Sequence, residues 1–249
     1  MTLPPVFLER PIAHRALHDT RARRPENSRA AAFAALEQGY GIEIDLQLSA
    51  DGQAMVFHDD ILDRLTSATG PVRAQSAAAL GKIALEHGNE TIPTLPEYFS
   101  LIAGRAPLLI ELKDQSGDLG ATCGRLEAAT ARALTAYHGP VALMSFNPHM
   151  VSTLARLAPQ IPRGLVGCGF TAEDWPDLPE EARERLRNLS LGPVEVSFIS
   201  HNHQHLSMPA IASLKSHGIP VLCWTIRTPE EEAKARCIAG NITFEGYRP

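Results

Sequence analysis

Residues 12–49 read IAHRALHDTRARRPENSRAAAFAALEQGYGIEIDLQLS, which is the pattern of a strand, a helix and a second strand. The first apolar run, PIAH at 11–14, ends in a histidine that an arginine follows. SRAAAFAALEQGY predicts a helix that Ser28 opens as N-cap and that closes near Gly39. GIEIDLQLS at 41–49 alternates apolar with polar residues and contains β-branched side chains, which predicts a strand. This order of elements favours a parallel sheet.

The same alternation of elements continues to the end of the chain. After Asp51-Gly52, a strong turn signal, AMVFH at 54–58 predicts a hairpin partner for the second strand. The stretch 59–93 that follows is expected to be a loop with one Ala-rich helical turn at most. Further apolar runs predict strands at 107–113, 141–146, 163–168, 194–200, 220–226 and 241–246. Helical patterns separate these runs, at 94–104, 119–137, 149–158, 179–189, 209–218 and 229–239.

Eight strands in 249 residues, most of them followed by a helix, are typical of an α/β protein with a TIM (β/α)8 barrel. We find no linker, repeat or low-complexity segment, so the expectation is a single domain over 1–249. A small hairpin and a loop insertion would follow the second barrel strand. A doubly wound open sheet is the alternative fold, but the sequence lacks the G-x-G-x-x-G and G-x-x-x-x-G-K-[ST] loops that such sheets often carry.

Composition narrows the classes of partner. Basic residues number 23 and acidic residues 28, so nothing favours nucleic acid, which calls for a basic surplus or patch. No apolar run approaches the ~18 residues that cross a bilayer, and the N-terminus lacks the pattern of a secretory signal. The four cysteines form no C-x-x-C pair, so we expect neither a zinc site nor a disulfide framework. These observations predict a cytoplasmic protein without stable membrane insertion, and they leave the oligomeric state open.

Charged and titratable residues collect at the ends of the predicted strands. Glu43 and Asp45 are two positions apart, as are Glu111 and Lys113, so each pair shares a strand face. In a parallel barrel the carboxyl ends of all strands open on one rim, where active sites lie. One rim would therefore gather seven candidate residues. They are His14, Arg15, Glu43, Asp45, His58, Glu111 and Lys113.

Three carboxylates at one rim would repel one another unless a cation joined them. Oxygen ligands favour one divalent cation, Mg²⁺ or Ca²⁺ with Mn²⁺ also possible, over zinc. Arg15 and Lys113 supply positive charge for an anion, and arginine can hold phosphate through two hydrogen bonds. His14 and His58 offer proton transfer at neutral pH. A cation site, two positive side chains and two histidines together describe a phosphodiesterase.

Several motifs resemble those of the glycerophosphodiester phosphodiesterase family. The resemblance spans nearly the whole chain, and the first 113 residues are its most specific part. Weaker similarities are M-S-F at 144–146 and W-T-I at 224–226. The specific motifs are H-R-A at 14–16, P-E-N-S at 25–28, E-I-D at 43–45, D-G at 51–52, H-D-D-x-L-x-R-x-T at 58–66, I-P-T-L-x-E at 92–97 and E-L-K at 111–113.

The resemblance implies a TIM barrel that splits a small-molecule glycerophosphodiester into glycerol 3-phosphate and an alcohol. The family's catalytic histidines match His14 and His58. Its metal ligands match Glu43, Asp45 and Glu111, and its phosphate-binding residues match Arg15 and Lys113.

This chain departs from the family pattern at three places. H-R-A replaces the usual H-R-G, Ile226-Arg227 stands where V-N is common, and Glu245 lies near an expected aspartate. These changes bear on the pocket for the alcohol head group, and Arg227 would favour a more anionic substrate.

The stretch S-H-N-H-Q-H at 200–205 has the alternation of a strand with three histidines on one face. That face would mimic a zinc site, but no carboxylate cluster accompanies it. We expect instead that Asn202 or His203 faces the rim and touches substrate, while the other residues of the stretch are exposed. Trp224 ends a strand and is a candidate wall of the glycerol pocket. Glu26-Asn27 is expected to cap a helix and to fix the loop behind His14.

Three functional alternatives and two chemical routes remain open. Besides a glycerophosphodiesterase, the barrel would suit a phospholipase D-like enzyme acting on sphingomyelin or lysophospholipid, which calls for a membrane-docking loop. A non-catalytic barrel that binds a phosphorylated ligand is the third possibility. The phosphorus would be attacked by water or by the neighbouring glycerol hydroxyl. The hydroxyl route gains the proximity of an intramolecular step.

Overall fold

The computed structural model describes residues 1–189 and 194–249, and these form a closed barrel of eight parallel strands. The sheet order is β1-β9-β8-β7-β6-β5-β4-β2-β3, and β1 also pairs with β2, which closes the ring. Its parallel strands are β1 (Ile12–Ala13), β2 (Gly41–Leu48), β4 (Leu108–Leu112), β5 (Val141–Ser145), β6 (Arg163–Gly167), β7 (Phe198–Asn202), β8 (Val221–Ile226) and β9 (Asn241–Phe244). The predicted TIM barrel is thereby confirmed.

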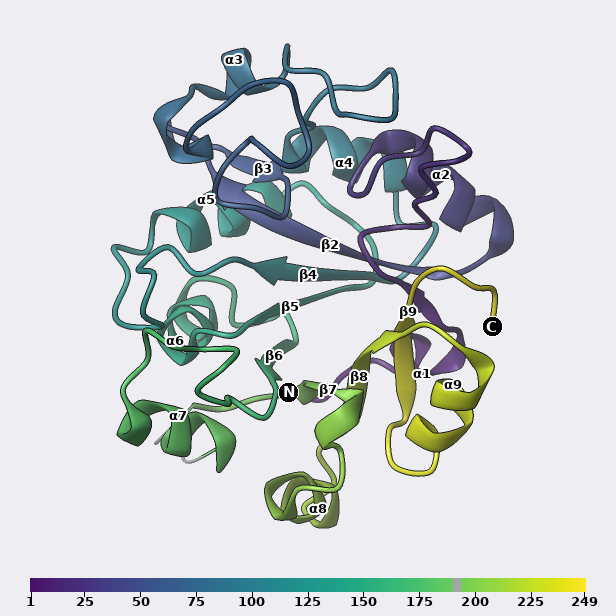
Figure 1. Cartoon of the computed structure of the whole chain (residues 1–249), viewed down its shortest axis with the longest axis vertical. Coiled ribbons are helices and arrows are strands. Elements are labelled where there is room, and N and C mark those ends of the chain that lie inside the picture. The colour runs from purple at the N-terminus through teal and green to yellow at the C-terminus, as the bar shows by residue number, and fades with distance from the viewer. Residues whose placement is uncertain (190–193) are drawn as a thin grey trace.

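Helices surround the strands on the outside of the barrel (Figure 1). They are α1 (Val6–Glu9), α2 (Arg29–Gln38), α4 (Leu95–Ile102), α5 (Arg125–Leu134), α6 (Pro148–Leu157), α7 (Glu180–Arg187), α8 (Pro209–Ser216) and α9 (Pro229–Ala235). The hydroxyl of Ser28 accepts a hydrogen bond from the backbone N–H of Ala31 and so caps α2, as predicted. Gly39 ends α2 at φ 69°, a left-handed conformation that glycine adopts without strain.

Strand β2 shows why polar residues point into this barrel. Ile42, Ile44 and Leu46 belong to the apolar layer between strands and helices. Because side chains alternate across a strand, Glu43 and Asp45 face the barrel interior. Strand β4 repeats the arrangement, with Leu108, Ile110 and Leu112 outside and Glu111 inside. The apolar outer face anchors each strand, so the inner face can carry charge.

Apolar side chains fill the barrel interior at the end where the strands begin. Phe7 of α1 is fully buried and packs with Leu109, Phe198 and Leu222 in one cluster. This cluster closes the end of the barrel opposite the strands' carboxyl ends. The charged inner residues Glu43, Asp45 and Glu111 therefore lie toward the other end, where the carboxyl ends of the strands open.

The insertion after β2 begins with β3 (Ala54–Val56), which pairs antiparallel with β2 as predicted. It then contains two short helical segments, η1 (Val72–Ala74) and α3 (Ala77–Leu80), where one turn at most was expected. Figure 1 shows this insertion above β3, at the top of the view. Its apolar residues, including Phe57, Leu62 and Leu80, form a buried cluster of their own, so the insertion is a packed unit.

Two predicted boundaries are wrong. The expected helix at 119–137 is shorter, because the carboxylate of Asp114 accepts hydrogen bonds from the backbone N–H groups of Gly117 and Leu119 and holds that stretch as a loop. The expected strand at 194–200 begins later, at Phe198, and runs to Asn202. The neighbouring strand β6 begins at Arg163, directly after Pro162, whose nitrogen has no hydrogen to donate to a sheet. The pairing of β7 with β6 therefore starts at Phe198, opposite Gly164.

All four cysteines are free. Within the described ranges, no helix combines the length and the apolar character that crossing a membrane requires.

Candidate active site

A pocket of about 280 Å³ opens at the rim formed by the carboxyl ends of the strands. Six of the seven predicted rim residues line it, together with Trp224. The seventh, Asp45, is buried at its base, where Lys113 contacts it. The six are His14, Arg15, Glu43, His58, Glu111 and Lys113.

The turn after β1 fixes Glu43 through the backbone. Arg15 and Ala16 adopt φ values of 50° and 64°, in the left-handed region. This turn aims the N–H of Arg15 at Oε2 of Glu43, at 2.8 Å, and the N–H of Ala16 donates to the Glu43 carbonyl at 2.9 Å. Non-glycine residues adopt this conformation at a cost, so the local backbone is held by its contacts with β2.

Glu43, Asp45 and Glu111 form one buried carboxylate cluster, and one ligand atom from each lies within 4.8 Å of the others. Burial, followed by the charges of Asp45 and Glu111, raises the pKa of Glu43 well above its usual range. Burial also opposes ionisation of Asp45, but Lys113, His58 and Arg15 hold its pKa below its usual range. Without a cation, Glu43 therefore tends to hold a proton, whereas Asp45 is ionised.

Lys113 and Asn27 orient the carboxylates. The Lys113 ammonium lies 2.9 Å from Oδ1 of Asp45 and 2.7 Å from Oε1 of Glu111. Asn27 is buried, donates from Nδ2 to Oδ2 of Asp45 at 3.0 Å and accepts the Asp45 N–H at 3.2 Å. The expectation that Glu26-Asn27 caps a helix is wrong, because Ser28 is the cap. The expected tie to the loop is present, since the Asn27 N–H donates to the Arg15 carbonyl.

The donor set fits a hard divalent cation. Its oxygens are close together, buried and already oriented by Asn27 and by the Arg15 backbone. Three carboxylates without nitrogen or sulfur ligands suit Mg²⁺, Ca²⁺ or Mn²⁺ better than zinc. A cation here would stabilise the charged form of Glu43, whose pKa is raised by burial first and then by the charges of Asp45 and Glu111.

Each candidate histidine binds a carboxylate through Nδ1. His14 Nδ1 lies 2.6 Å from Oε2 of Glu245, and His58 Nδ1 lies 2.6 Å from Oδ1 of Asp59. Burial would raise the pKa of each carboxyl, but the hydrogen bonds from the histidines and nearby arginines hold both pKa values below their usual range. An ionised carboxylate only accepts, so Nδ1 carries the proton and Nε2 remains available in each ring.

An arginine–carboxylate network ties the insertion to the rim. Arg64 contacts Asp59 through Nε at 2.7 Å and Glu26 through Nη2 at 2.9 Å. Glu26 in turn accepts a hydrogen bond from Arg15 Nη1 at 2.8 Å. This network holds the His58–Asp59 pair of the insertion against the turn after β1.

Aromatic and apolar side chains form the opposite wall of the pocket. Met144, Phe146 and Trp224 line it, and the rings of Phe146 and Trp224 meet edge to face at 5.6 Å. Trp224 Nε1 donates to the Ser200 carbonyl, which fixes the indole. Trp224 therefore lies where a wall of the pocket was expected. Arg227 lines the same pocket, and its Nη2 lies 2.7 Å from Oε1 of Glu245.

The S-H-N-H-Q-H stretch does not form a single strand. His201 is buried in β7, whereas His203–His205 form the 3-10 segment η2, so the alternating face is wrong. The Asn202 side chain accepts the Gln204 N–H at 2.9 Å and caps η2. His203 lines a different cleft, beside Glu231. In the chain outside 190–193, neither Asn202 nor His203 is among the residues that line the rim pocket.

Sequence reasoning missed several polar partners of the site. It assigned no role to Asp59 or Arg64, although both lie in the H-D-D-x-L-x-R-x-T motif, and a carboxylate directly after a candidate catalytic histidine was the available signal. It noted Glu245 only as a departure from a pattern. His18, whose Nε2 lies 3.5 Å from Oε2 of Glu245, had no signal at all.

Comparison with known proteins points to the family that the sequence motifs resemble. The model of the Glycerophosphoryl diester phosphodiesterase family matches residues 14–242. A glycerophosphodiester phosphodiesterase of Caldanaerobacter subterraneus subsp. tengcongensis is 30% identical over 230 residues, covering 88% of this chain and 86% of the relative.

Solved structures share the fold. A phosphodiesterase of Oleispira antarctica, in complex with the product sn-glycerol-3-phosphate, is 28% identical with a TM-score of 0.76. The match covers 96% of this chain and 93% of that one. A glycerophosphodiester phosphodiesterase of Parabacteroides distasonis has a TM-score of 0.74 at 22% identity, with 94% and 92% coverage, and shows the fold alone.

Proposed function

This chain belongs to the glycerophosphodiester phosphodiesterase family, and from that premise we propose how it hydrolyses glycerophosphodiesters to glycerol 3-phosphate and an alcohol. The observation that carries the proposal is one pocket of about 280 Å³ lined by both carboxylate-bound histidines and by ligands of the buried carboxylate cluster. The product bound by the Oleispira antarctica relative, glycerol 3-phosphate, is the product proposed for this enzyme.

One divalent cation, Mg²⁺ or Ca²⁺ with Mn²⁺ possible, is proposed to bind Glu43, Asp45 and Glu111. Bound there, it would neutralise negative charge that grows on the phosphate oxygens during the reaction. The buried position of the cluster strengthens this effect, because water screens the charges less.

Arg15 and Lys113 are proposed to hold the phosphate. The ammonium of Lys113 lies at the pocket surface and keeps its charge, since Asp45 and Glu111 outweigh burial and raise its pKa. Arg15 donates from Nη1 to Glu26, while its Nε has no hydrogen-bond partner in the described part of the chain. The same Nε lies 3.7 Å from Oδ2 of Asp45, so the guanidinium borders the carboxylate cluster, where the phosphate is proposed to bind.

His14 and His58 are proposed to exchange the roles of general base and general acid. Each has Nδ1 engaged by a carboxylate, so Nε2 takes or gives the proton. Glu245 and Asp59 also stabilise the imidazolium that forms when the proton is taken. In the first proposed step, one histidine deprotonates the glycerol hydroxyl next to the phosphoester, and this hydroxyl attacks phosphorus to form a cyclic phosphate. The other histidine protonates the departing alcohol oxygen. In the second step the two histidines reverse their roles as water opens the cyclic phosphate.

The phospholipase D-like alternative finds little support in the insertion. Its large apolar residues are mostly buried in its own cluster, and Ile61 is the exposed exception within the described residues. A non-catalytic barrel is also disfavoured, because both histidines and all three carboxylates line or underlie one pocket.

A direct assay with glycerophosphocholine tests the proposal. We expect release of glycerol 3-phosphate and choline, loss of turnover in excess EDTA, and recovery when Mg²⁺, Ca²⁺ or Mn²⁺ is restored. Sphingomyelin and lysophosphatidylcholine, assayed in parallel, should be poor substrates. Full turnover in excess EDTA would remove the cation from the mechanism. Preference for the lipids would favour the phospholipase D-like alternative, and binding without turnover of any substrate would favour a non-catalytic barrel.

A further inference from the structure

A second cleft, of about 490 Å³, lies beside the active-site pocket. It is formed by the loop after β1 and by the C-terminal segment after β9. These two segments lie next to each other because β1 and β9 are neighbours in the closed barrel. The volume falls in the range of small-molecule sites, whereas the active-site pocket is below it and suits a group as small as glycerol phosphate.

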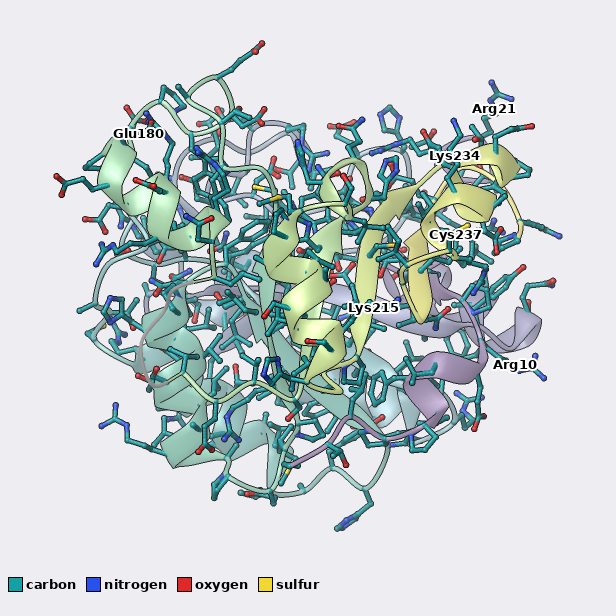
Figure 2. All side chains as sticks on the ribbon, turned by 90° about the horizontal axis from the view of Figure 1, so that it is seen from below. Arg10, Arg21, Glu180, Lys215, Lys234 and Cys237 are labelled. Carbon is teal, nitrogen blue, oxygen red and sulfur yellow. The ribbon has the colours of Figure 1, made fainter. Side chains whose placement is uncertain are left out.

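The cleft is basic on a chain whose formal net charge is −5. Arg21, Arg24 and Arg248 line it against one acidic residue, Asp19. Arg24 lies 3.6 Å from Asp19, and the buried Nε of Arg24 has no hydrogen-bond partner in the part of the chain that the structure describes. Over the same residues, neither Arg21 nor Arg248 takes part in an ion pair. Figure 2 shows Arg21 projecting from the surface of the fold.

The cleft and the active-site pocket share a wall. His18 lines the cleft, and its Nε2 lies 3.5 Å from Oε2 of Glu245. The same carboxylate oxygen lies 2.6 Å from Nδ1 of His14, which lines the active-site pocket. Gly246, which also lines the cleft, directly follows Glu245 in the chain. The carboxylate of Glu245 thus lies between the two sites, contacted by His14 from the pocket and by His18 from the cleft.

We propose that this cleft binds the alcohol half of the substrate and selects glycerophosphodiesters whose alcohol carries a second anionic group, above all a phosphate monoester. The inference rests on the proposed function, because the phosphodiester must lie at the carboxylate cluster for its alcohol to enter the cleft. Unpaired guanidinium groups hold phosphate oxygens through charge-assisted hydrogen bonds, which a neutral or cationic alcohol cannot accept in the same way.

A pair of substrates that differ only in that phosphate tests the proposal. Glycerophosphoinositol and glycerophosphoinositol 4-phosphate are compared by kcat/KM in the wild type and in the R21A/R248A double variant. We expect the wild type to prefer the phosphorylated substrate and the double variant to lose about 10-fold of that preference, given the modest strength of exposed charge pairs. Arg23→Ala is the matched control, because Arg23 lies in the same loop but contacts Asn89 and is not part of the cleft.

Each outcome is decisive. An unchanged preference in the double variant, or an equal loss in Arg23→Ala, overturns the cleft as the alcohol site. Thermal unfolding of the double variant checks that it is folded. If no glycerophosphodiester is hydrolysed, the proposed function fails separately, and calorimetric titration with inositol 4-phosphate decides the cleft. Binding that weakens in R21A/R248A and not in Arg23→Ala then supports it, and absence of binding to the wild type rejects it.

Discussion

His14 Nδ1 and Glu245 Oε2 lie 2.6 Å apart although the two residues are separated by 231 positions in the chain. They meet because β1 pairs with β9 where the barrel closes. His14 directly follows β1, and Glu245 directly follows β9. Glu245 also contacts Arg227 at 2.7 Å, so its carboxylate is held from a second side. The closure of the fold thus fixes the ring of a proposed catalytic histidine.

Glu245→Gln should lower kcat by about 10²-fold, because the neutral amide stabilises a protonated His14 less and its NH2 group can donate to Nδ1, which favours the other tautomer. KM should change little, since Glu245 is not one of the described residues that line the active-site pocket. Steady-state kinetics separates the two constants. Glu230→Gln serves as the control, because Glu230 is exposed in α9 and takes part in no ion pair among the described residues. A Glu245→Gln enzyme with wild-type kcat would show that Glu245 does not position His14.

Glu43→Gln, Asp45→Asn and Glu111→Gln should each weaken divalent cation binding and lower turnover. The physical reason is the loss of one charged oxygen from a cluster whose ligand atoms lie within 4.8 Å of one another. Calorimetric titration with Mg²⁺, Ca²⁺ and Mn²⁺ measures the binding directly, and the rise of the unfolding temperature on adding metal provides a second readout.

Glu195→Gln is the matched control for the cluster variants, since Glu195 is exposed and its only contact noted in the described chain is a 3.8 Å pair with Arg163. It should bind metal as the wild type does. If the three cluster variants bound metal with unchanged affinity, the carboxylates would have to be assigned another role.

Much of the barrel follows from local sequence patterns. The alternation in β2 predicts that Glu43 and Asp45 face inward, because Ile42 and Ile44 need the apolar layer outside. The cap of α2 at Ser28 also follows from short-range chemistry. Such features depend on residues a few positions apart, so a single sequence contains their cause.

Other features depend on which distant segments meet, and local patterns do not contain that information. The Asn27–Asp45 pair needs the loop before α2 to fold back over β2. The end of β7 depends on the Asn202 side chain, which caps η2 and ends the alternation of the three histidines. A strand and a capped 3-10 turn compete for the same residues, and the periodicity alone favours the strand.

Acid should destabilise the protein partly through Asp59. Burial opposes its ionisation, but His58 and Arg64 hold its pKa below its usual range in the folded state. A carboxyl with a lowered folded-state pKa contributes stability above its unfolded pKa of about 3.9, and that stability is lost as the pH falls further. Asp59→Asn should therefore flatten the loss of stability below about pH 4. At pH 7 it should cost on the order of 1 kcal/mol after solvent screening.

Urea unfolding at a series of pH values measures this effect. Glu86→Gln is the control, because Glu86 is exposed in the same insertion and has no ion pair in the described residues. It should leave the pH profile unchanged. An Asp59→Asn profile parallel to that of the wild type would assign the acid sensitivity to other carboxyls.

His14→Ala and His58→Ala should each lower kcat by about 10²–10⁴-fold, the range for a positioned acid or base. The double variant should lose little beyond the worse single variant, because groups that act in one proton-transfer sequence are not additive. Both single variants should keep their cation affinity, since neither ring belongs to the carboxylate cluster. A single variant with near wild-type kcat would make that histidine structural.

The nucleophile is predicted to be the glycerol hydroxyl next to the phosphoester. The pocket of about 280 Å³, with Phe146 and Trp224 as its wall, has room to hold the glycerol against the phosphate, and held near-attack geometry favours an intramolecular step. That step forms a cyclic phosphate and expels the alcohol, and water then opens the ring while the two histidines reverse their roles. Attack by water would need no fixed glycerol, so the pocket wall would serve binding alone.

A substrate whose glycerol 2-hydroxyl is replaced by hydrogen distinguishes the two routes. On the hydroxyl route the deoxy analogue should bind, compete with the natural substrate and turn over at least ~10²-fold more slowly, because the proximity advantage is lost with the nucleophile. Its inhibition constant checks that binding survives, and the cation requirement should be unchanged because the phosphate still meets the same cluster. A kcat comparable to that of the natural substrate would assign the attack to water, since the only group removed is the one that the intramolecular route requires.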